Sequence, residues 1–478
     1  MISGLGMLIS RSIGRLVPDP FVIALALTIL TAILSLVFGF EGLSRSEAVD
    51  KLLDQWWSPG LWAFLKFSMQ MCLILVTGYA LADSHMVRRA INGLSNLPGS
   101  TGGAAVLISL CAMLTGLLNW GLGLIVGALL ARRVGESLEQ RGIPAHYPLL
   151  CAAGYTGLLV WHGGLSGSAP IKMTKADEVA DIMPQELLQK MEIPVIPLQE
   201  TLLSNLNIIT NLGLLLLVPV ALLLLAPRRT DKVSPIPASV TSQPVEDDQD
   251  ENPGGTSQLV AAAISLLVGA ALICGMIVYL AEVGFGRIGP NEIIATMLGL
   301  GMILHVSPHS YLRSIEKAAR GCAGIILQFP FYAGIMAMMA GSGLLAMISG
   351  FASSQTSATT LPLFTFLSAG LVNLFVPSGG GQWGIQGPIA MEAAAHLNSQ
   401  IEAAAAASGT AVDPDELVQN SRMVMAVAYG DELTNMLQPF WALPLLAITG
   451  IKARDMVGYT AMIMVLAGLW MAACLAWF

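Results

Sequence analysis

An apolar stretch in the first half of the chain ends with the sequence Trp161-His162-Gly163-Gly164-Leu165-Ser166-Gly167-Ser168-Ala169-Pro170. The stretch begins at Tyr147 and is therefore long enough to cross a membrane, which takes about 20 apolar residues. Glycine and proline destabilise the interior of a helix, so a continuous helix does not tolerate them at this density. The sequence predicts a transmembrane helix that is broken within the stretch.

The composition of the 478-residue chain excludes the soluble classes of protein. Hydrophobic residues make up 55% of the chain and charged residues 11%, and the mean hydropathy is +0.70. A soluble fold of this length could not cover its surface with so few charges. The net charge of −8 argues against a nucleic-acid partner, because phosphate binding needs a basic face. The six cysteines lack metal-ligand spacing, so we interpret them as core residues.

Residues 103–131 contain no charged side chain, yet basic pairs flank them on both sides. The pairs are Arg88 with Arg89 and Arg132 with Arg133. A single crossing would place one pair on the wrong face of the membrane, because Lys and Arg favour the cytoplasmic side. A re-entrant hairpin that turns near Asn119-Trp120-Gly121 keeps both pairs on one face, whereas one long crossing is the alternative.

The second half of the chain repeats these features. No Asp, Glu, Lys or Arg occurs from Gly321 to Met391, which predicts a span at 321–350 and a second hairpin at 358–391. We expect this hairpin to turn between Asn373 and Gly387 and an external polar loop to follow at 392–420. A second broken helix is expected at 423–450, around Gly430-Asp431-Glu432-Leu433-Thr434-Asn435.

The remaining apolar stretches complete a fold of about nine spans and two hairpins. The continuous spans are expected at 20–40, 61–82, 201–226, 258–284, 290–306, 321–350 and 456–478. Arg11 and Arg15 predict a cytoplasmic N-terminus, and the span count then predicts a periplasmic C-terminus. Residues 230–257 are rich in proline and acidic side chains and predict a disordered cytoplasmic linker.

The order of elements indicates two inverted repeats, an N-terminal one at 1–229 and a C-terminal one at 258–478 that starts with an extra linking span. Gly116-Leu117-Leu118-Asn119 matches Gly370-Leu371-Val372-Asn373, and Ala152, Tyr155 and Pro170 share their spacing with Ala426, Tyr429 and Pro444. We therefore predict an all-α polytopic membrane protein in which each repeat carries a re-entrant hairpin and a broken transmembrane helix. Discontinuous helices in inverted halves are typical of the binding site of a secondary transporter.

The hairpin turns and breaks carry hydroxyl, amide and aromatic side chains but no Lys or Arg. This favours a small monocarboxylate, because a multiply charged anion usually needs an arginine clamp. The candidate substrate-binding residues are Asn119, Trp120, His162, Ser166, Ser168, Asn373, Ser378, Gln382, Trp383, Thr434 and Asn435. Trp120, Trp161, Trp383 and Trp441 are interpreted either as an aromatic wall around a short apolar tail or as packing residues.

Three ionisable residues lie inside the expected spans. His162 serves either as a structural hydrogen-bonding group or as a substrate donor and proton carrier. For Asp431 and Glu432, one is expected to coordinate a cation or titrate during coupling, whereas the other caps a half-helix. We predict no cofactor, and the only metal considered is Na⁺ as the coupling ion.

The motif at 161–170 resembles the signature of the bacterial short-chain fatty acid transporter family. Further similarity lies in Gln328-Phe329-Pro330-Phe331-Tyr332-Ala333-Gly334-Ile335, in the segment from Asn373 to Pro388, and in residues 430–435. The resemblance implies uptake of short monocarboxylates such as acetoacetate or butyrate across the inner membrane. It also implies a place among ion transporters built on paired hairpins and broken helices.

We therefore expect an inner-membrane secondary transporter that takes up short-chain fatty acids by Na⁺ or H⁺ symport. The alternative is a cation/proton antiporter or another organic-anion carrier on the same scaffold. An enzyme is not expected, since the chain lacks HExxH, GxSxG and Walker A motifs. The expected partners are the carboxylate, the lipid bilayer and a second copy of the chain in a homo-oligomer.

Overall fold

The structure, a computed structural model, is built from helices that pack side by side. It describes residues 20–40, 42–58, 60–174, 176–183, 195–227, 233–241, 256–284, 290–344, 347, 357–412 and 416–478. Within these residues the regular elements are α-helices and short 3-10 helices, and no strand occurs. The all-α fold class is therefore confirmed.

The first half of the chain contains the elements α2 to α13. They are α2 (Pro20–Phe38), α3 (Arg45–Trp57), η1 (Gly60–Trp62), α4 (Leu65–Asp83), α5 (His85–Ser95), α6 (Thr101–Leu118), α7 (Trp120–Gln140), α8 (Tyr147–Tyr155), η2 (Thr156–Leu159), α9 (Ser168–Lys172), α10 (Ala176–Ile182), α12 (Asn205–Leu225) and α13 (Ala238–Thr241).

The second half contains the elements α14 to α23. They are α14 (Thr256–Val283), α15 (Pro290–His305), α16 (Pro308–Ala319), η5 (Arg320–Cys322), α17 (Ala323–Gly341), α19 (Leu361–Asn373), α20 (Gly379–Ser408), α21 (Asn420–Thr434), η7 (Asn435–Leu437), α22 (Pro439–Thr449) and α23 (Ala453–Trp477).

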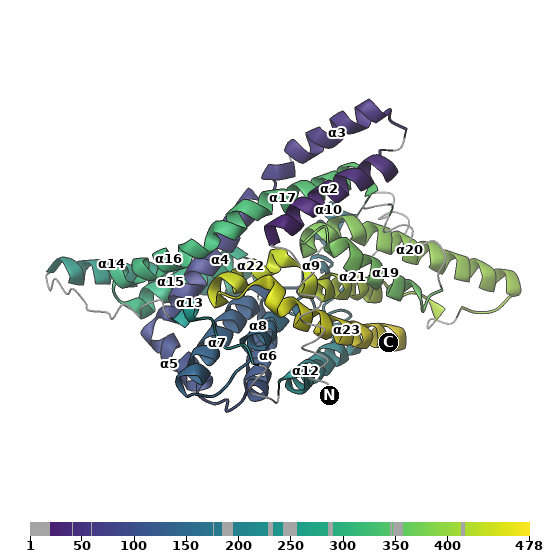
Figure 1. Cartoon of the computed structure of the whole chain (residues 1–478). Coiled ribbons are helices and arrows are strands. Elements are labelled where there is room, and N and C mark those ends of the chain that lie inside the picture. Colours follow the sequence, from purple (N-terminus) through teal and green to yellow (C-terminus); the bar gives the residue numbers. More distant parts are fainter. Residues whose placement is uncertain are drawn as a thin grey trace.

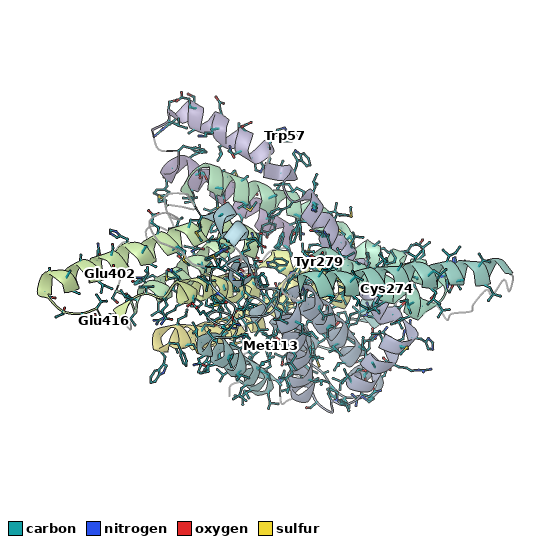
Figure 2. The ribbon with its side chains drawn as sticks, turned by 180° about the vertical axis from the view of Figure 1, so that it is seen from behind. Trp57, Met113, Cys274, Tyr279, Glu402 and Glu416 are labelled. Carbon is teal, nitrogen blue, oxygen red and sulfur yellow. The ribbon has the colours of Figure 1, made fainter. Side chains whose placement is uncertain are left out.

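The broken helices lie in the central part of the molecule and the long helices surround them. Figure 1 shows α6, α7, α8 and α12 gathered below α21 and α22, while α2 runs beside α17 above them. The helices α14 and α20 project in opposite directions, and Figure 2 shows Cys274 and Tyr279 on one projection and Glu402 on the other. The elements that carry the candidate site are thus covered on several sides by other helices.

Seven helical stretches among the described residues are long and apolar enough to cross a membrane. They are Pro20–Phe38, Arg45–Asp83, Thr101–Leu118, Asn205–Leu225, Leu259–Glu282, Pro308–Gly341 and Ala453–Trp477. Six of them overlap the continuous spans expected from the sequence, whereas Thr101–Leu118 is the first limb of the expected hairpin. The chain is therefore a membrane protein.

The helices α6 and α7 form a tight antiparallel hairpin. Asn119 ends α6 and starts α7, where its Oδ1 accepts hydrogen bonds from the N–H groups of Gly121 and Leu122 at 2.8 and 3.3 Å. A methyl group added to Gly123 would lie 2.5 Å from Cα of Gly116, so the two helices approach too closely for any larger residue.

Both ends of this hairpin lie on one face of the molecule. Arg141, which follows α7, donates hydrogen bonds to the carbonyl oxygens of Asn96 and Pro98, which precede α6. The hairpin geometry agrees with the sequence prediction, while the depth of its turn in the membrane remains a prediction.

The chain leaves the helical conformation in both segments where breaks were expected. After α8 and η2, residues 160–167 are irregular until α9 begins at Ser168. In the second half α21 passes into η7, Gln438 is extended, and α22 begins at Pro439.

The second hairpin differs from its prediction in length. Its turn covers only 374–378, because Ser378 caps α20 and the glycine-rich segment after it is helical. The expected external loop at 392–420 is wrong for residues 392–408, which continue α20. The Ala-rich sequence after Glu402 favours a helix, and Gly409 ends it with φ 68°.

Part of the expected disordered linker packs against the helices. Ser234 donates a backbone hydrogen bond to Nδ1 of His146, and the backbone N–H of Tyr147 donates to the carbonyl oxygen of Ser234. Ile236 and Val240 are buried. Residues 233–241 are therefore ordered against α8, while 228–232 and 242–255 lie outside the described residues, and the division into two repeats stays a prediction.

Cysteine labelling tests the hairpin directly. Because residues 96–98 and 141 are hydrogen-bonded neighbours, Leu97→Cys and Gln140→Cys are expected to react with a membrane-impermeant thiol reagent from the same side. Ala403→Cys on α20 is expected to react from the other side. Labelling of positions 97 and 140 from opposite sides would show that α6 and α7 together cross the membrane once.

Candidate functional site

The two breaks meet at a buried cluster of ionisable groups, which we call the junction. It contains His162 from the first break and Asp431 and Glu432 from the last turn of α21. The exposed fraction of each residue is at most 1%. All three lie in the predicted breaks, but their mutual contact could not be inferred from the sequence, since 269 residues separate His162 from Asp431.

The imidazole of His162 is hydrogen-bonded at both nitrogens. Its Nδ1 lies 2.7 Å from Oδ2 of Asp431, and its Nε2 accepts a hydrogen bond from the backbone N–H of Ala169 at 3.0 Å. Because Nε2 must keep a lone pair for this bond, the proton is on Nδ1 and is donated to the Asp431 carboxylate. A second proton on Nε2 would displace the N–H of Ala169 and disturb the start of α9.

The carboxylate of Glu432 accepts hydrogen bonds from backbone N–H groups of the first break, which in a continuous helix would donate to carbonyl oxygens. Its Oε2 accepts the N–H groups of His162 and Gly163 at 2.8 and 3.4 Å. Its other oxygen, Oε1, is buried and has no hydrogen-bond partner among the described residues. Glu432 therefore holds the two breaks together and leaves one buried oxygen available for a ligand.

Two tyrosines connect the breaks reciprocally. The hydroxyl of Tyr155 donates to the carbonyl oxygens of Asn435 and Gln438 in the second break, at 2.9 and 3.1 Å. The hydroxyl of Tyr429 donates to Oδ1 of Asn207, whose amide donates to the carbonyl oxygen of Gly163 in the first break. Tyr155 and Tyr429 are the residues that the sequence pairs as repeat equivalents.

Asn373, at the end of α19, binds the second hairpin to the second break. Its Nδ2 donates to the carbonyl oxygen of Asp431 at 2.7 Å, to Oγ1 of Thr434 at 3.0 Å and to Oδ1 of Asn435 at 2.9 Å. The side-chain amide of Gln438 donates back to the carbonyl oxygen of Asn373. The predicted candidates Asn373, Thr434 and Asn435 therefore share one hydrogen-bond network.

The first hairpin contacts the first break in the same manner. The N–H of Trp120 donates to Oγ of Ser166 at 3.0 Å, and the N–H of Leu165 donates to the carbonyl oxygen of Leu117 at 2.7 Å. Asn119 is buried, and its Nδ2 has no hydrogen-bond partner in the described ranges. The hydrogen bonds of Asn119 and Ser166 thus maintain the turn and its contact with the break.

The N-terminus of α20 packs against the first break through its first glycines. Ser378 caps this helix through a hydrogen bond from the N–H of Gly381 to its Oγ. A methyl group on Gly379 would lie 3.0 Å from Cε1 of His162 and 3.1 Å from Oδ2 of Asp431. The helix start therefore abuts the junction directly.

Lys172 is the residue that sequence reasoning missed. A methyl group on Gly380 would lie 3.6 Å from Nζ of Lys172 and 3.9 Å from Cβ of Ser168. No hydrogen bond or ion pair of Lys172 occurs within the part of the chain that the structure describes. The sequence places Lys172 at the end of α9, only two residues after Pro170, and this proximity to the motif could have identified it. The candidate residues predicted in this segment were limited to the motif itself.

The predicted aromatic candidates occupy three different environments. Trp161 stacks on His162 with 4.3 Å between ring centroids, whereas Trp120 packs against Trp441 at 5.1 Å. Trp383 is fully buried near the start of α20, next to Gln382, whose amide donates to the carbonyl oxygen of Ala369. Trp383 and Gln382 therefore pack inside the second hairpin, away from the contact between the breaks.

The described residues contain no group of three or more His, Cys, Asp or Glu arranged to hold a metal ion. Amide oxygens offer a different donor set. Within the part of the chain that the structure describes, Oδ1 of Asn373 and Oε1 of Gln438 are buried without hydrogen-bond partners, as is Oε1 of Glu432. Oxygen ligands of this kind suit a hard cation such as Na⁺.

Comparison with known proteins gives consistent results along the whole chain. The family described as "Short chain fatty acid transporter" matches residues 1–478. Similar proteins named "Putative short-chain fatty acid transporter" occur in Escherichia coli, with 35% identity, and in Haemophilus influenzae, with 33% identity. Each alignment covers 462 residues and 96% of both chains. Among solved structures, the Alcanivorax borkumensis YdaH transporter is similar with a TM-score of 0.40 and 15% identity over 96% of this chain and 97% of that one.

Measurements of thermal stability test the role of Glu432 in holding the two breaks together. Glu432→Ala leaves the N–H groups of His162 and Gly163 without an acceptor, at a cost of about 1–3 kcal/mol for each buried group. Glu432→Gln keeps an oxygen acceptor. Thermal unfolding in detergent should therefore show a larger loss of Tm for Glu432→Ala than for Glu432→Gln, and little change for the exposed control Glu402→Ala. Equal Tm values for the two Glu432 variants would contradict this role.

Proposed function

This chain belongs to the short chain fatty acid transporter family, and on that premise we propose that it takes up short monocarboxylates of the acetoacetate and butyrate class across the inner membrane. It is a transporter and not an enzyme. The observation that carries the substrate proposal is the convergence of Lys172, the N-terminus of α20 and the junction at one place. Lys172 and the N–H groups at the start of α20 supply the positive groups there, and Trp161 supplies an aromatic face beside them.

The carboxylate of the substrate is proposed to bind at the start of α20. The first N–H groups of a helix lack intrahelical partners, and the helix dipole favours an anion there. Lys172 supplies a full positive charge beside Gly380, and Ser168 supplies a hydroxyl. One lysine with a helix terminus matches a single carboxylate, whereas a dicarboxylate would leave its second charge without a partner.

The ring of Trp161 is proposed to cover the short alkyl tail. A methyl group on Gly379 would lie 2.7 Å from Cη2 of Trp161, so the indole touches the start of α20 one residue before the glycine beside Lys172. Trp161 is itself fixed by its stacking on His162. An aromatic face of this size suits a chain of a few carbons, and a longer tail would have to enter the packed core behind it.

Coupling to a cation is proposed to occur at the second break. Na⁺ would be held by the unpartnered oxygens of Asn373, Gln438 and Glu432. Proton coupling would instead use Nε2 of His162, where a proton displaces the N–H of Ala169 and loosens α9 beside Lys172. Both routes link cation occupancy to the element that carries the substrate anchor.

Two inverted repeats are proposed as the basis of alternating access. Each hairpin tip is hydrogen-bonded to the break of its own half, through Ser166 in the first and Thr434 in the second. The reciprocal hydrogen bonds of Tyr155 and Tyr429 support an equivalence of the halves. With the basic residues on the cytoplasmic face, the N-terminus would be cytoplasmic and the C-terminus periplasmic.

Uptake of labelled butyrate by proteoliposomes tests the junction. His162→Ala removes the link to Asp431 and to Ala169, and Asp431→Asn removes the carboxylate that fixes the His162 tautomer. Each is expected to reduce uptake by more than tenfold while the protein remains inserted. The matched controls are the exposed His396→Ala and Asp455→Asn, which should transport normally. Normal uptake in both junction variants would remove His162 and Asp431 from the mechanism.

Lys172→Gln tests the substrate anchor. Loss of a charge-assisted hydrogen bond costs about 1.5–3 kcal/mol, so KM for butyrate should rise about tenfold or more. The uncharged analogue butyramide should inhibit the wild type and Lys172→Gln about equally, because it lacks the charge that Lys172 binds. Lys66→Gln, on the exposed side of α4, is the control. An unchanged KM for butyrate in Lys172→Gln would place the carboxylate elsewhere.

A further inference from the structure

A second charged region is formed by residues other than those of the junction. It is a cavity of about 1340 Å³ bounded by α4, α7, α16, η5 and α22. The charged residues that line it are Arg88, Arg132, Arg133, Arg313, Lys317, Arg320, Asp83, Glu136, Glu139 and Glu316. Leu443, Leu446 and Ala447 from α22 form part of its apolar wall.

The cations of this cavity exceed its acids. Glu136 accepts hydrogen bonds from both Arg132 and Arg133 at 2.9 Å, and Asp83 pairs with Arg88 at 2.6 Å. Lys317 and Arg320 form no ion pair with any described residue. A concave site with an excess of one charge raises the local concentration of the opposite ion. The cavity is therefore suited to collecting small anions.

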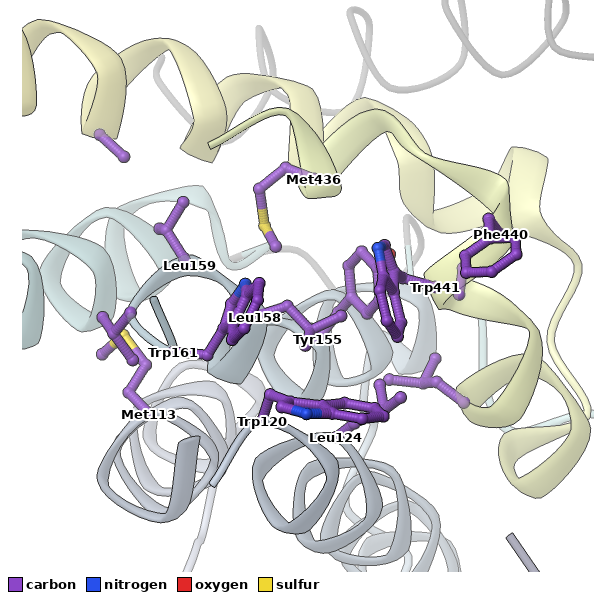
Figure 3. Close-up of a cluster of buried hydrophobic side chains, with 14 of the residues drawn as sticks. Met113, Trp120, Leu124, Tyr155, Leu158, Leu159, Trp161, Met436, Phe440 and Trp441 are labelled. Atoms are coloured by element: carbon purple, nitrogen blue, oxygen red, sulfur yellow. The ribbon is translucent and has the colours of Figure 1, made fainter. Parts of the chain in front are cut away.

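An aromatic cluster lies at the start of α22, shortly before the lining residue Leu443 of that helix. We call it the aromatic plug, and it consists of Phe67, Trp120, Phe329, Phe440 and Trp441. Phe440 stacks on Phe329 with 4.0 Å between ring centroids, and Trp441 meets Trp120 at 5.1 Å. Figure 3 shows Trp120, Trp441 and Phe440 gathered at the start of α22.

Each member of the plug comes from a helix that borders the cavity or adjoins it. Phe67 precedes the lining residue Leu75 on α4, and Phe329 follows the lining residue Gly324 on α17. On α22 the plug residues come directly before Leu443. The plug thus lies where these helices pass from the cavity toward the second break.

The helix α22 connects the cavity to the second break. Gln438, which precedes α22, accepts the hydroxyl of Tyr155 through its carbonyl oxygen. From Gln438 to Ala447 the chain rises about 13 Å at 1.5 Å per residue. Phe440 and Trp441 lie on α22 between these two ends.

We propose that the basic cavity is an anion-binding vestibule of the transport path and that the aromatic plug is the closed gate between the vestibule and the junction. The ligand is a short monocarboxylate, held loosely by Lys317 and Arg320 before entry or after release. Movement of α22 would part Phe440 from Phe329 and open the path. This proposal rests on the proposed function for the identity of the anion, but its charge and its gate can be measured without transport.

Cysteine modification measures the charge of the vestibule. In a chain whose six cysteines are replaced by serine, Ala447→Cys should react at least threefold faster with an anionic sulfonate thiol reagent than with its cationic ammonium analogue. Ala406→Cys, at an exposed position on α20 outside the cavity, is the control that gives the ratio of the two reaction rates in the absence of a vestibule. Adding Lys317→Gln and Arg320→Gln should lower the ratio at position 447 toward that control. Equal reaction rates of the two reagents at position 447 would overturn the proposal.

Butyrate kinetics distinguish the transported carboxylate from a lipid headgroup. Combined Lys317→Gln and Arg320→Gln should raise KM threefold to tenfold with little change in maximal rate, whereas Lys452→Gln, outside the cavity, should not. The change in KM should persist in liposomes of phosphatidylcholine alone. If it appears only with anionic lipids, the cations bind lipid and the vestibule is rejected. If the wild type transports no butyrate while the labelling preference at position 447 holds, only the proposed function fails.

The gate is tested at Met436, which lies in the second break and is 1% exposed. Met436→Cys should be unreactive to the anionic reagent added from the basic side, and Phe440→Ala should make it reactive. Phe440→Leu retains bulk and serves as the control for folding. Equal reactivity of Met436→Cys with phenylalanine, leucine or alanine at position 440 would show that the plug is no gate.

Discussion

Peptide groups that leave a helix inside a membrane protein must find partners within the protein, because lipid offers none. This constraint determines the centre of the fold. The irregular residues 160–167 obtain a partner from Glu432, a side chain of the other broken helix. The irregular residues after Thr434 obtain theirs from Tyr155 in the first half. Each break is therefore completed by the opposite half of the chain.

The hydrogen bonds between the two breaks also explain why the ionisable residues Asp431 and Glu432 are buried. A buried carboxylate is costly unless it is hydrogen-bonded. Asp431 accepts a hydrogen bond from His162, and Glu432 accepts hydrogen bonds from two backbone N–H groups. The groups that complete the breaks are therefore also the groups through which we propose coupling to protons or cations.

The glycines make the close packing of these elements possible. Gly123 approaches Gly116 within the first hairpin, and Gly379 approaches His162 and Asp431 across the junction. A methyl group at Gly379 would meet Trp161 and His162, and Gly380 lies beside Nζ of Lys172. The same residues that weaken the helices in isolation therefore let the start of α20 reach the place where we propose that the substrate binds.

Much of this arrangement could be predicted from the sequence, and the limits have physical causes. The density of glycine around His162 and the flanking arginine pairs of the first hairpin are local signals, and both gave the correct elements. The pairing of His162 with Asp431 is a tertiary contact, on which sequence spacing carries no information. Lys172 was missed because its relevance depends on the position of Gly380, more than two hundred residues away. The long helix α20 was missed beyond Met391 because polarity was weighed above the helix propensity of its alanines.

The central claim is that substrate binds where the two broken helices meet. Crystallography with 4-bromobutyrate locates the ligand directly, through the anomalous signal of bromine. The account predicts a bromine peak beside Trp161, with the carboxylate at the N-terminus of α20 and near Nζ of Lys172. A peak remote from α20 and α9, with the junction between His162 and Asp431 unchanged, would contradict it.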